Sequence, residues 1–283
     1  MIIGRHRRAV IQRIASKAKA KHFNDKVELN DPTLTPTASK LVIARFWHHQ
    51  SRITGQISAA VVRSLLTIIT PFLTTRVKII GQHHLPKTAS ALITCNHYNQ
   101  LDILPIKKLA MRRNKRLYFM VEDTNLVMHF PIGLLVRNAD SIPVTTNLHY
   151  LGRVLPQKIK QILTKPAWIL VYPEQQMWFN YRRIRPFKKG AYYFAAKFNL
   201  PIISCFVEIQ NCQQKELFHR DFYKTRCVLH VLPTIYPDSE KSIAENTKLM
   251  RKQDYQQKKA AYERIYGKKI DQPFTFDDIA GLK

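Results

Sequence analysis

From residue 77 onward, strand-like and helix-like segments alternate along the chain, and this alternation limits the possible folds more than any other feature of the sequence. Short apolar runs typical of strands occur at 77–81, 90–95, 116–122, 141–144, 167–173, 201–209 and 227–235. Segments typical of helices lie between most of them, at 103–113, 125–137, 147–164 and 187–198. This order predicts an α/β core, with a mixed, largely parallel sheet flanked by helices.

The remaining parts of the chain lie on either side of this core, which we place at 76–238. Residues 1–40 are expected to be a basic N-terminal segment and linker, and 41–75 an N-terminal helical segment that associates with a membrane. For 1–26 we expect a solvated tail, with a basic amphipathic helix as the alternative. Residues 239–283 are expected to form a C-terminal helix and tail.

The apolar run 54–75 is the segment with the strongest membrane signal. Arg63 and Pro71 interrupt it, so it is expected to be a core helix or a helix lying in the membrane interface, ended by Pro71. With 46 Lys and Arg against 19 Asp and Glu, the net charge is +27, which predicts an anionic partner. A membrane surface, a nucleic acid and a phosphorylated substrate all fit that charge.

The sequence lacks the motifs of several cofactor classes. It contains no G-x-G-x-x-G and no P-loop, and its histidines show no H-x-x-x-H or H-E-x-x-H spacing. We therefore expect no bound cofactor and no metal site. In open α/β sheets, ligands bind beyond the carboxyl ends of the strands, so polar residues that follow strands are the first candidates for a site.

The first such cluster is "NHYNQLD" at 96–102, between a strand and a helix. A carboxylate at Asp102 can accept from Nδ1–H of His97 and leave Nε2 free to take a proton. No serine stands nearby as a nucleophile, so a substrate hydroxyl would have to take that role. Alternatively, Asp102 satisfies amides in its own helix, and Asn96 and Asn99 only shape the turn.

The second cluster is "VYPEQQ" at 171–176, after a very apolar strand. Here Glu174 is either a polar anchor for a substrate hydroxyl or an exposed acid in an ordinary turn.

Taken in order, these blocks resemble the glycerolipid acyltransferase family of the 1-acylglycerol-3-phosphate acyltransferase (PlsC-like) type. His97 and Asp102 match its N-H-x-x-x-x-D motif, Tyr172–Glu174 matches F-P-E, and Pro201 opens a strand like its proline-rich one. The resemblance implies O-acyl transfer from acyl-CoA or acyl-carrier protein to a hydroxyl of a lysophospholipid or related glycerolipid. His97 would be the general base, oriented by Asp102. Residues that would bind substrate are Asn96, Pro173, Glu174, Gln175, Arg137, Arg182 and Arg183.

The departures from the family pattern concern recognition of the acceptor. The second block, "FPIGLLVRNADSIPVTT", keeps Pro131 and Gly133 but ends in Thr145–Thr146, where the family has V-D-R. Met177 stands where the third block has arginine. The family's two arginines are associated with the acceptor's phosphate. Either other cations near these blocks replace them, or the acceptor carries no terminal phosphate monoester. The candidate cations are Arg137, Arg182, Arg183, Arg185, Lys188 and Lys189.

The implied location is the cytoplasmic face of the cell membrane, with peripheral or monotopic attachment to an anionic surface. Two other classes of protein remain as alternatives. One is a non-catalytic lipid-binding protein with an acyltransferase-like fold, and the other is a basic nucleic-acid-binding protein, although no nucleic-acid-binding motif is present and no nucleic acid is expected as a partner.

Overall fold

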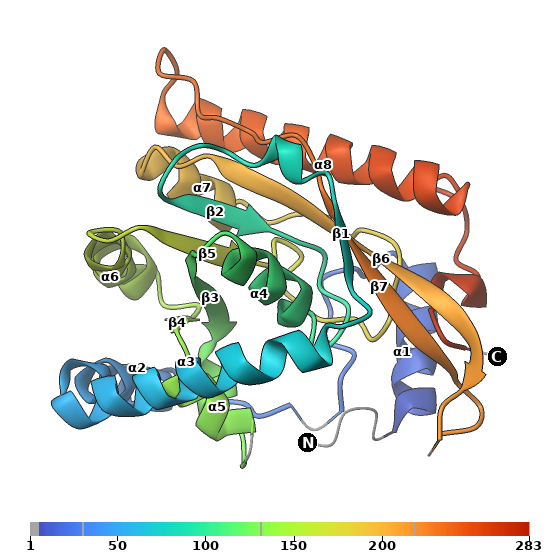
Figure 1. The fold of residues 1–283 in the computed structure, drawn as a ribbon, viewed down its shortest axis with the longest axis horizontal. Helices are drawn as coiled ribbons and strands as arrows, with labels where there is room; N and C mark the ends of the chain where they lie inside the picture. Colours follow the sequence, from blue (N-terminus) through green and yellow to red (C-terminus); the bar gives the residue numbers. More distant parts are fainter. Residues whose placement is uncertain (1–5, 30, 131, 218, 283) are drawn as a thin grey trace.

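The computed structural model describes residues 6–29, 31–130, 132–217 and 219–282, and Figure 1 shows its fold. In that part of the chain, seven strands form one sheet in the order β1-β7-β6-β2-β5-β3-β4. The strands are β1 (Lys78–Ile80), β2 (Ala91–Thr94), β3 (Arg116–Glu122), β4 (Ser141–Val144), β5 (Ala167–Val171), β6 (Ile202–Lys215) and β7 (Tyr223–Val231). Each of the seven expected strand segments is present.

The sheet is mixed and largely parallel, as predicted. Strand β2 pairs in parallel with β5 and β6, and β5, β3 and β4 continue the parallel part. Only the β6–β7 hairpin among the ladders of these strands is antiparallel, and β1 pairs in parallel with β7. The carboxyl ends of β2 and β5 lie side by side, with Thr94 opposite Val171.

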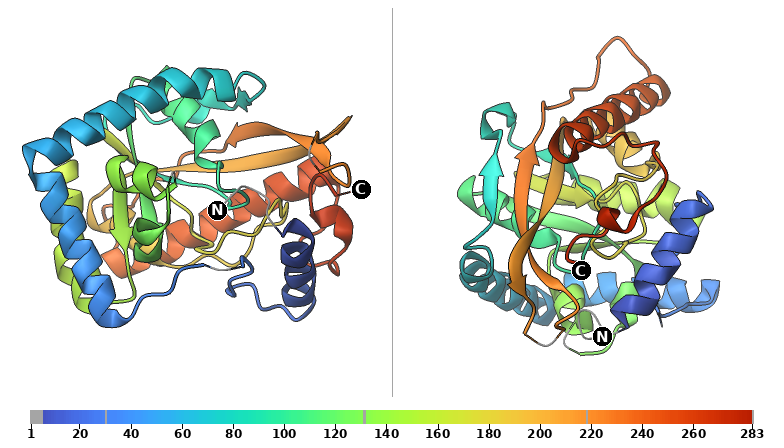
Figure 2. Two further views of the ribbon diagram at one scale, coloured as in Figure 1. Left: turned by 90° about the horizontal axis from the view of Figure 1, so that it is seen from below. Right: turned by 90° about the vertical axis from the view of Figure 1, so that its right-hand side faces the viewer.

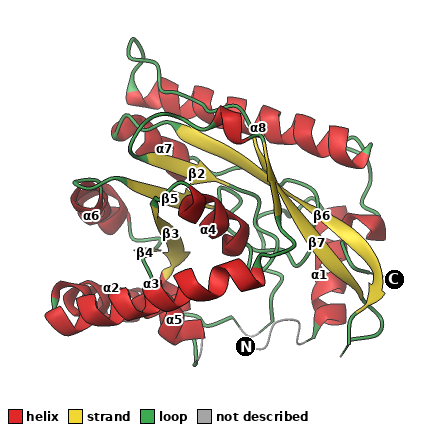
Figure 3. Cartoon of the chain, in the orientation of Figure 1, coloured by secondary structure: helices red, strands yellow, loops and turns green. Residues whose placement is uncertain are grey.

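Helices cover both faces of the sheet (Figures 1 and 3). Successive side chains of a strand point to opposite faces. Leu92 accordingly belongs to one apolar cluster with α7 and α8, and Ile93 to another with α4. The helices of the core are α4 (Ile103–Arg112), α5 (Ile132–Asn138), α6 (Leu155–Ile162), α7 (Gly190–Lys197) and α8 (Ile243–Tyr266). Helix α8 is the expected C-terminal helix, and a Ser242–Glu245 capping box begins it.

Two long helices, α2 (Pro36–Ser51) and α3 (Ile53–Leu73), precede the sheet and lie at an angle to each other on the outside of the molecule (Figure 2). Pro36 occupies the first turn of α2, where its missing N–H removes no helical bond. The expectation that Pro71 ends the helix is wrong, because α3 continues to Leu73. Nor are residues 36–40 a linker, since α2 already includes them.

The expectation of a solvated N-terminal tail is also wrong. Residues Arg7–Lys19 form helix α1, which buries Val10, Ile11 and Ile14. These side chains pack with Trp178 and Ile279, so α1 shares an apolar cluster with the loop after β5 and with the C-terminal tail. Figures 1 and 2 show α1 beside the C-terminal segment.

Candidate active site

His97 and Asp102 meet in the loop between β2 and α4. The His97 Nδ1 lies 2.6 Å from Asp102 Oδ2. The histidine side chain is 21% exposed, whereas that of the aspartate is 4% exposed. The other ring nitrogen, Nε2, is on the edge of the ring opposite this bond. The predicted contact is therefore present, and a buried carboxylate holds the inner nitrogen of a partly exposed imidazole.

The Asp102 carboxylate accepts hydrogen bonds from residues outside its own helix. It occupies the N-cap position of α4 but makes no side-chain capping bond there. Its Oδ2 also accepts from the backbone N–H of Tyr98 at 3.2 Å, and its Oδ1 accepts from the Tyr172 hydroxyl at 2.6 Å. The alternative that Asp102 satisfies amides of its helix is therefore wrong.

Tyr172 is a third member of this arrangement, and sequence reasoning missed its role. It follows the last residue of β5, and its ring stacks on that of His97 with centroids 4.1 Å apart and planes 12° apart. Burial and the neighbouring Asp102 charge raise the pKa of the phenol well above its ordinary value, so the hydroxyl stays a neutral donor. Tyr172 thus packs on one face of the imidazole and donates a hydrogen bond to the carboxylate that orients it.

Asn96 joins β2 to β6 instead of shaping the turn. Its side-chain amide donates to the carbonyl of Val207 at 3.1 Å and accepts from the N–H of the same residue at 2.8 Å. The next asparagine, Asn99, does shape the turn, because its Oδ1 accepts from the N–H of Leu101. The loop that carries His97 is therefore anchored just before the histidine and folded back just after it.

Glu174 is not the exposed turn acid of the simpler interpretation, because it is 2% exposed. Its Oε2 lies 2.8 Å from Nη2 of Arg185, which is 1% exposed, and accepts from the backbone N–H of His97 at 3.3 Å. Its Oε1 accepts from the backbone N–H of Arg185. This buried ion pair thus ties the His97 loop to the loop after β5. Arg185 also contacts the carbonyls of His97 and Gln176 and lies over the Trp178 ring.

Pro173 and Gln175 flank this glutamate. The Pro173 carbonyl accepts from the N–H of Lys188 at 2.8 Å. Gln175 has a left-handed backbone with φ of 64° and an exposed side chain. The turn therefore directs Glu174 inward and Gln175 outward, where a ligand could reach its amide.

The three arginines expected to bind substrate lie in different places. Arg137, on α5, donates to the carbonyls of Leu126 and Met128. Arg183 pairs with the buried Asp278 at 2.8 Å. Arg182 bonds to β6 and to the C-terminal tail. None of the three contacts His97 or Asp102 through a hydrogen bond or ion pair among the described residues.

Residues of the second sequence block have structural roles in α5 and in the contact with α2. A Cβ on Gly133 would lie 1.7 Å from the Met128 carbonyl oxygen, which explains the glycine. The Thr145 hydroxyl lies 3.0 Å from that of Ser39 on α2, so this position, where the family has a charged residue, contacts a helix instead. Pro131 lies outside the described residues.

The segment between α1 and α2 contacts the loop after β5, which in turn bonds to the loop that carries His97. The Trp178 indole donates to the carbonyl of Asp25 at 3.0 Å, and Arg185 donates to that of Phe23 at 3.3 Å. The same tryptophan donates its backbone N–H to the carbonyl of His97. Glu28 follows in this segment, and burial and the neighbouring Asp31 raise its pKa to about 7, while His97 opposes the shift.

Replacing Glu28 should change how stability depends on pH. Its ordinary pKa is 4.5, so between about pH 4.5 and pH 7 the folded protein keeps a proton that the unfolded chain loses, and stability falls as pH rises. We expect Glu28→Gln to be more stable than the parent at about pH 8 and equal to it at about pH 4. Urea unfolding across this range measures the difference, and a difference that does not vary with pH would contradict the prediction.

Chemically, the arrangement offers an oriented imidazole whose Nε2 can accept a proton beside the carboxyl edge of a largely parallel sheet. Within the described ranges, no group of three or more His, Cys, Asp or Glu side chains is placed to hold a metal ion.

Comparison with known proteins gives a consistent family. A family model described as Acyltransferase matches residues 76–208, which include both polar clusters. The 1-acyl-sn-glycerol-3-phosphate acyltransferase alpha of Mus musculus is 24% identical over 185 residues, and that of Homo sapiens is 23% identical over 188 residues. Each alignment covers 61% of this chain and 61% of the relative.

Among solved structures, the crystal structure of the 1-acyl-sn-glycerophosphate acyltransferase PlsC from Thermotoga maritima aligns with a TM-score of 0.49 and 15% identity. That alignment covers 92% of this chain and 97% of the other.

Proposed function

We propose that the protein is an O-acyltransferase acting on a glycerolipid, because residues 76–208 match the acyltransferase family model. The acyl group would come from a thioester, acyl-CoA or acyl-carrier protein, and would pass to a hydroxyl of a lysophospholipid. The observation that carries the proposal is the His97–Asp102–Tyr172 arrangement inside the matched segment.

In the proposed reaction, Nε2 of His97 removes the proton from the acceptor hydroxyl as its oxygen attacks the thioester carbonyl. The C–O bond of the new ester forms, and the C–S bond breaks when the tetrahedral intermediate collapses. The proton held by His97 passes to the departing thiolate. Asp102 stabilises the imidazolium during this sequence, and Tyr172 keeps both groups in position.

We propose that the acceptor is a lysophospholipid and that the enzyme is not restricted to lysophosphatidic acid. The sequence has Thr146 and Met177 where the family has its phosphate-associated arginines. Arg137 and Arg183 donate to protein carbonyls, and Arg183 is also neutralised by Asp278. Arg183 is therefore already neutralised and is a poor substitute for a missing arginine, whereas Arg137 bonds only to uncharged carbonyls.

A panel assay tests the proposed function. The purified full chain is given a labelled acyl-CoA or an acylated carrier protein, each with several lysolipids that differ in headgroup, and products are identified by mass spectrometry. We expect one donor class to acylate lysophospholipids, with lysophosphatidic acid no better than the phosphodiester lipids. Absence of turnover with every donor and acceptor would overturn the proposal.

We place the enzyme at a membrane surface on the evidence of α3. This helix is long and apolar enough to cross a membrane, and only 11% of its most apolar window is buried in the protein. Its outer face exposes Ile57, Ile68 and Phe72, which are 58%, 64% and 74% exposed. The one charge in its interior, Arg63, points inward and pairs with Asp140 at 3.0 Å. An apolar outer face with its charge turned inward fits a helix that lies in the membrane interface.

The double substitution Ile57→Glu/Ile68→Glu should weaken membrane binding. Each side chain contributes about 1.5–3 kcal/mol when fully buried in an apolar medium, so the partition into liposomes should fall by about 100-fold or more. Co-flotation with anionic liposomes measures the effect. Leu249→Glu, on the exposed face of α8, is the matched control and should leave flotation unchanged. Equal flotation of the double variant and the parent would count against α3 as the contact surface.

A further inference from the structure

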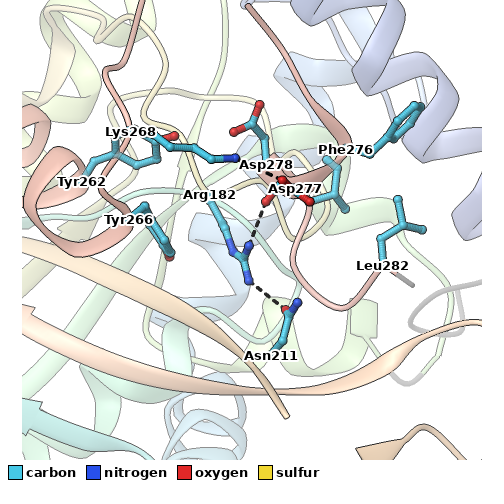
Figure 4. Close-up of a pocket in the computed structure, with 10 residues that line it drawn as sticks. Arg182, Asn211, Tyr262, Tyr266, Lys268, Phe276, Asp277, Asp278 and Leu282 are labelled. Carbon is cyan, nitrogen blue, oxygen red and sulfur yellow. Dashed lines mark hydrogen bonds and ion pairs between the residues drawn. The ribbon is translucent and has the colours of Figure 1, made fainter. Parts of the chain in front are cut away.

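A cavity of about 300 Å³ lies between the end of α8, the C-terminal tail and β6 (Figure 4). Its wall combines polar and apolar side chains. They are Arg182, Asn211, Tyr262, Tyr266, Lys268, Phe276, Asp277, Asp278, Ile279 and Leu282. None of these residues belongs to the His97 loop, so the cavity is separate from the candidate active site.

Arg182 brings a positive charge into this cavity that no carboxylate neutralises. Its guanidinium donates to the carbonyl of Ile209 at 3.1 Å, to the carbonyl of Asp277 at 2.8 Å and to Oδ1 of Asn211 at 2.8 Å. All three acceptors are uncharged, and among the described residues no carboxylate oxygen lies within 4.0 Å of it. Because a guanidinium has five N–H donors, these bonds leave donors for a further oxygen ligand.

The two aspartates of the wall do not cancel that charge. Asp278 is 1% exposed, pairs with Arg183 and accepts from the backbone N–H of Thr275. The Asp277 side chain is 83% exposed and approaches Lys268 at 3.4 Å. One aspartate is thus neutralised by its own arginine and the other lies in water, where its effect is screened. In Figure 4 the Lys268 side chain extends toward Asp277, whose backbone carbonyl also accepts from Arg182.

We propose that this cavity binds the phosphorylated nucleoside end of a coenzyme A thioester, with its 3′-phosphate on Arg182 and Lys268. Arginine and lysine are the side chains that recognise phosphate best. The exposed ring of Phe276 supplies the flat, apolar surface that a nucleobase requires, whereas Tyr262 is buried and Arg182 lies over the Tyr266 ring. The inference rests on the proposed function, and it selects acyl-CoA rather than acyl-carrier protein as the donor.

The position of the cavity favours the donor over the acceptor as the source of the phosphate. In a lysolipid the phosphate is only a few bonds from the hydroxyl that reacts, so its site must adjoin His97. In acyl-CoA the nucleotide phosphates lie at the far end of the pantetheine arm from the thioester, so their site must be distant. The cavity shares no residue with the catalytic loop but is joined to it through Asn180, which bonds to Tyr98 and to Ala280.

Binding of adenosine 3′,5′-bisphosphate, CoA and dephospho-CoA to the full chain tests the proposal without requiring turnover. Isothermal titration should give a Kd for CoA that is about tenfold or more lower than that for dephospho-CoA, since a charge-assisted phosphate contact is lost. Arg182→Gln should weaken the binding of CoA by a similar factor and the binding of dephospho-CoA much less. Arg153→Gln, an exposed arginine elsewhere, is the matched control and should leave both values unchanged.

If Arg182→Gln does not fold, the affinities for CoA and dephospho-CoA can still be compared in the parent protein and in Lys268→Gln. In the panel assay, Arg182→Gln should raise KM for acyl-CoA while kcat stays near the parent value. Equal affinity of the parent for CoA and dephospho-CoA, or turnover with acyl-carrier protein alone, would overturn this inference and leave the proposed acyl transfer intact. Loss of all turnover with normal CoA binding would instead count against the proposed function.

Discussion

Substitution of His97 by alanine should reduce acyl transfer by about 100- to 10,000-fold, the range that a positioned general base contributes. The effect should appear in kcat, because the imidazole acts on the proton that moves in the transition state rather than on substrate binding. Single-turnover mass spectrometry of product lipid is the appropriate measurement. Unfolding by urea should be nearly unchanged, since the side chain is partly exposed and packs mainly on one tyrosine ring.

The control and the partner variants sharpen this test. His149→Ala removes an exposed histidine outside the site and should have parental activity. Asp102→Asn should also be strongly impaired, because it removes the charge that stabilises the imidazolium. The double variant His97→Ala/Asp102→Asn should be no worse than His97→Ala alone, since the two residues act as a unit. Parental turnover in pure His97→Ala would remove the proposed mechanism.

The sheet could be predicted from the sequence because each strand is a short apolar run between turn residues or helices. In β2 and β5 nearly every side chain is buried, since both faces of a central parallel strand are covered. Local pattern alone therefore marks these strands. The order of the strands was not predicted, because it depends on contacts between segments far apart in the chain.

The contact between His97 and Asp102 was predictable for a similar reason, since the two residues lie in one loop and five positions apart. Tyr172 and Arg185 were not assigned their roles, because their contacts with that loop arise only when β5 lies beside β2. A tyrosine after a strand has many possible roles, and its sequence neighbours do not show that it faces a histidine 75 positions earlier.

The N-terminal segment was misjudged because its apolar residues are few and strongly basic residues surround them. Val10, Ile11 and Ile14 form a narrow stripe that suffices for a packed helix only if a partner surface exists. That surface is made by Trp178 and Ile279, which lie more than 160 residues later. The helix is therefore specified by tertiary packing rather than by local sequence.

Breaking the Glu174–Arg185 ion pair from one side should give the largest loss of stability of any substitution near the site. Both side chains are almost fully buried, so Glu174→Leu would leave the guanidinium without a counter-charge in the interior. Burial already lowers the pKa of Arg185, which shows how poorly the surroundings solvate its charge. We expect the free energy of unfolding to fall by about 3–5 kcal/mol in urea titrations.

The double variant Glu174→Leu/Arg185→Met separates the charge effect from the lost contacts. If an uncompensated charge causes the loss, removing the second charge should restore part of the stability. The sum of the stability losses in the two single variants should then exceed the loss in the double variant. The exposed pair Arg8–Asp221 is the matched contrast, and Arg8→Ala should cost less than about 1 kcal/mol. Glu174 accepts from the backbone N–H of His97, and Arg185 contacts the His97 carbonyl. If the double variant regains stability but not activity, the ion pair contributes to activity by positioning the His97 loop. Additive losses would instead show that the two side chains stabilise the fold independently.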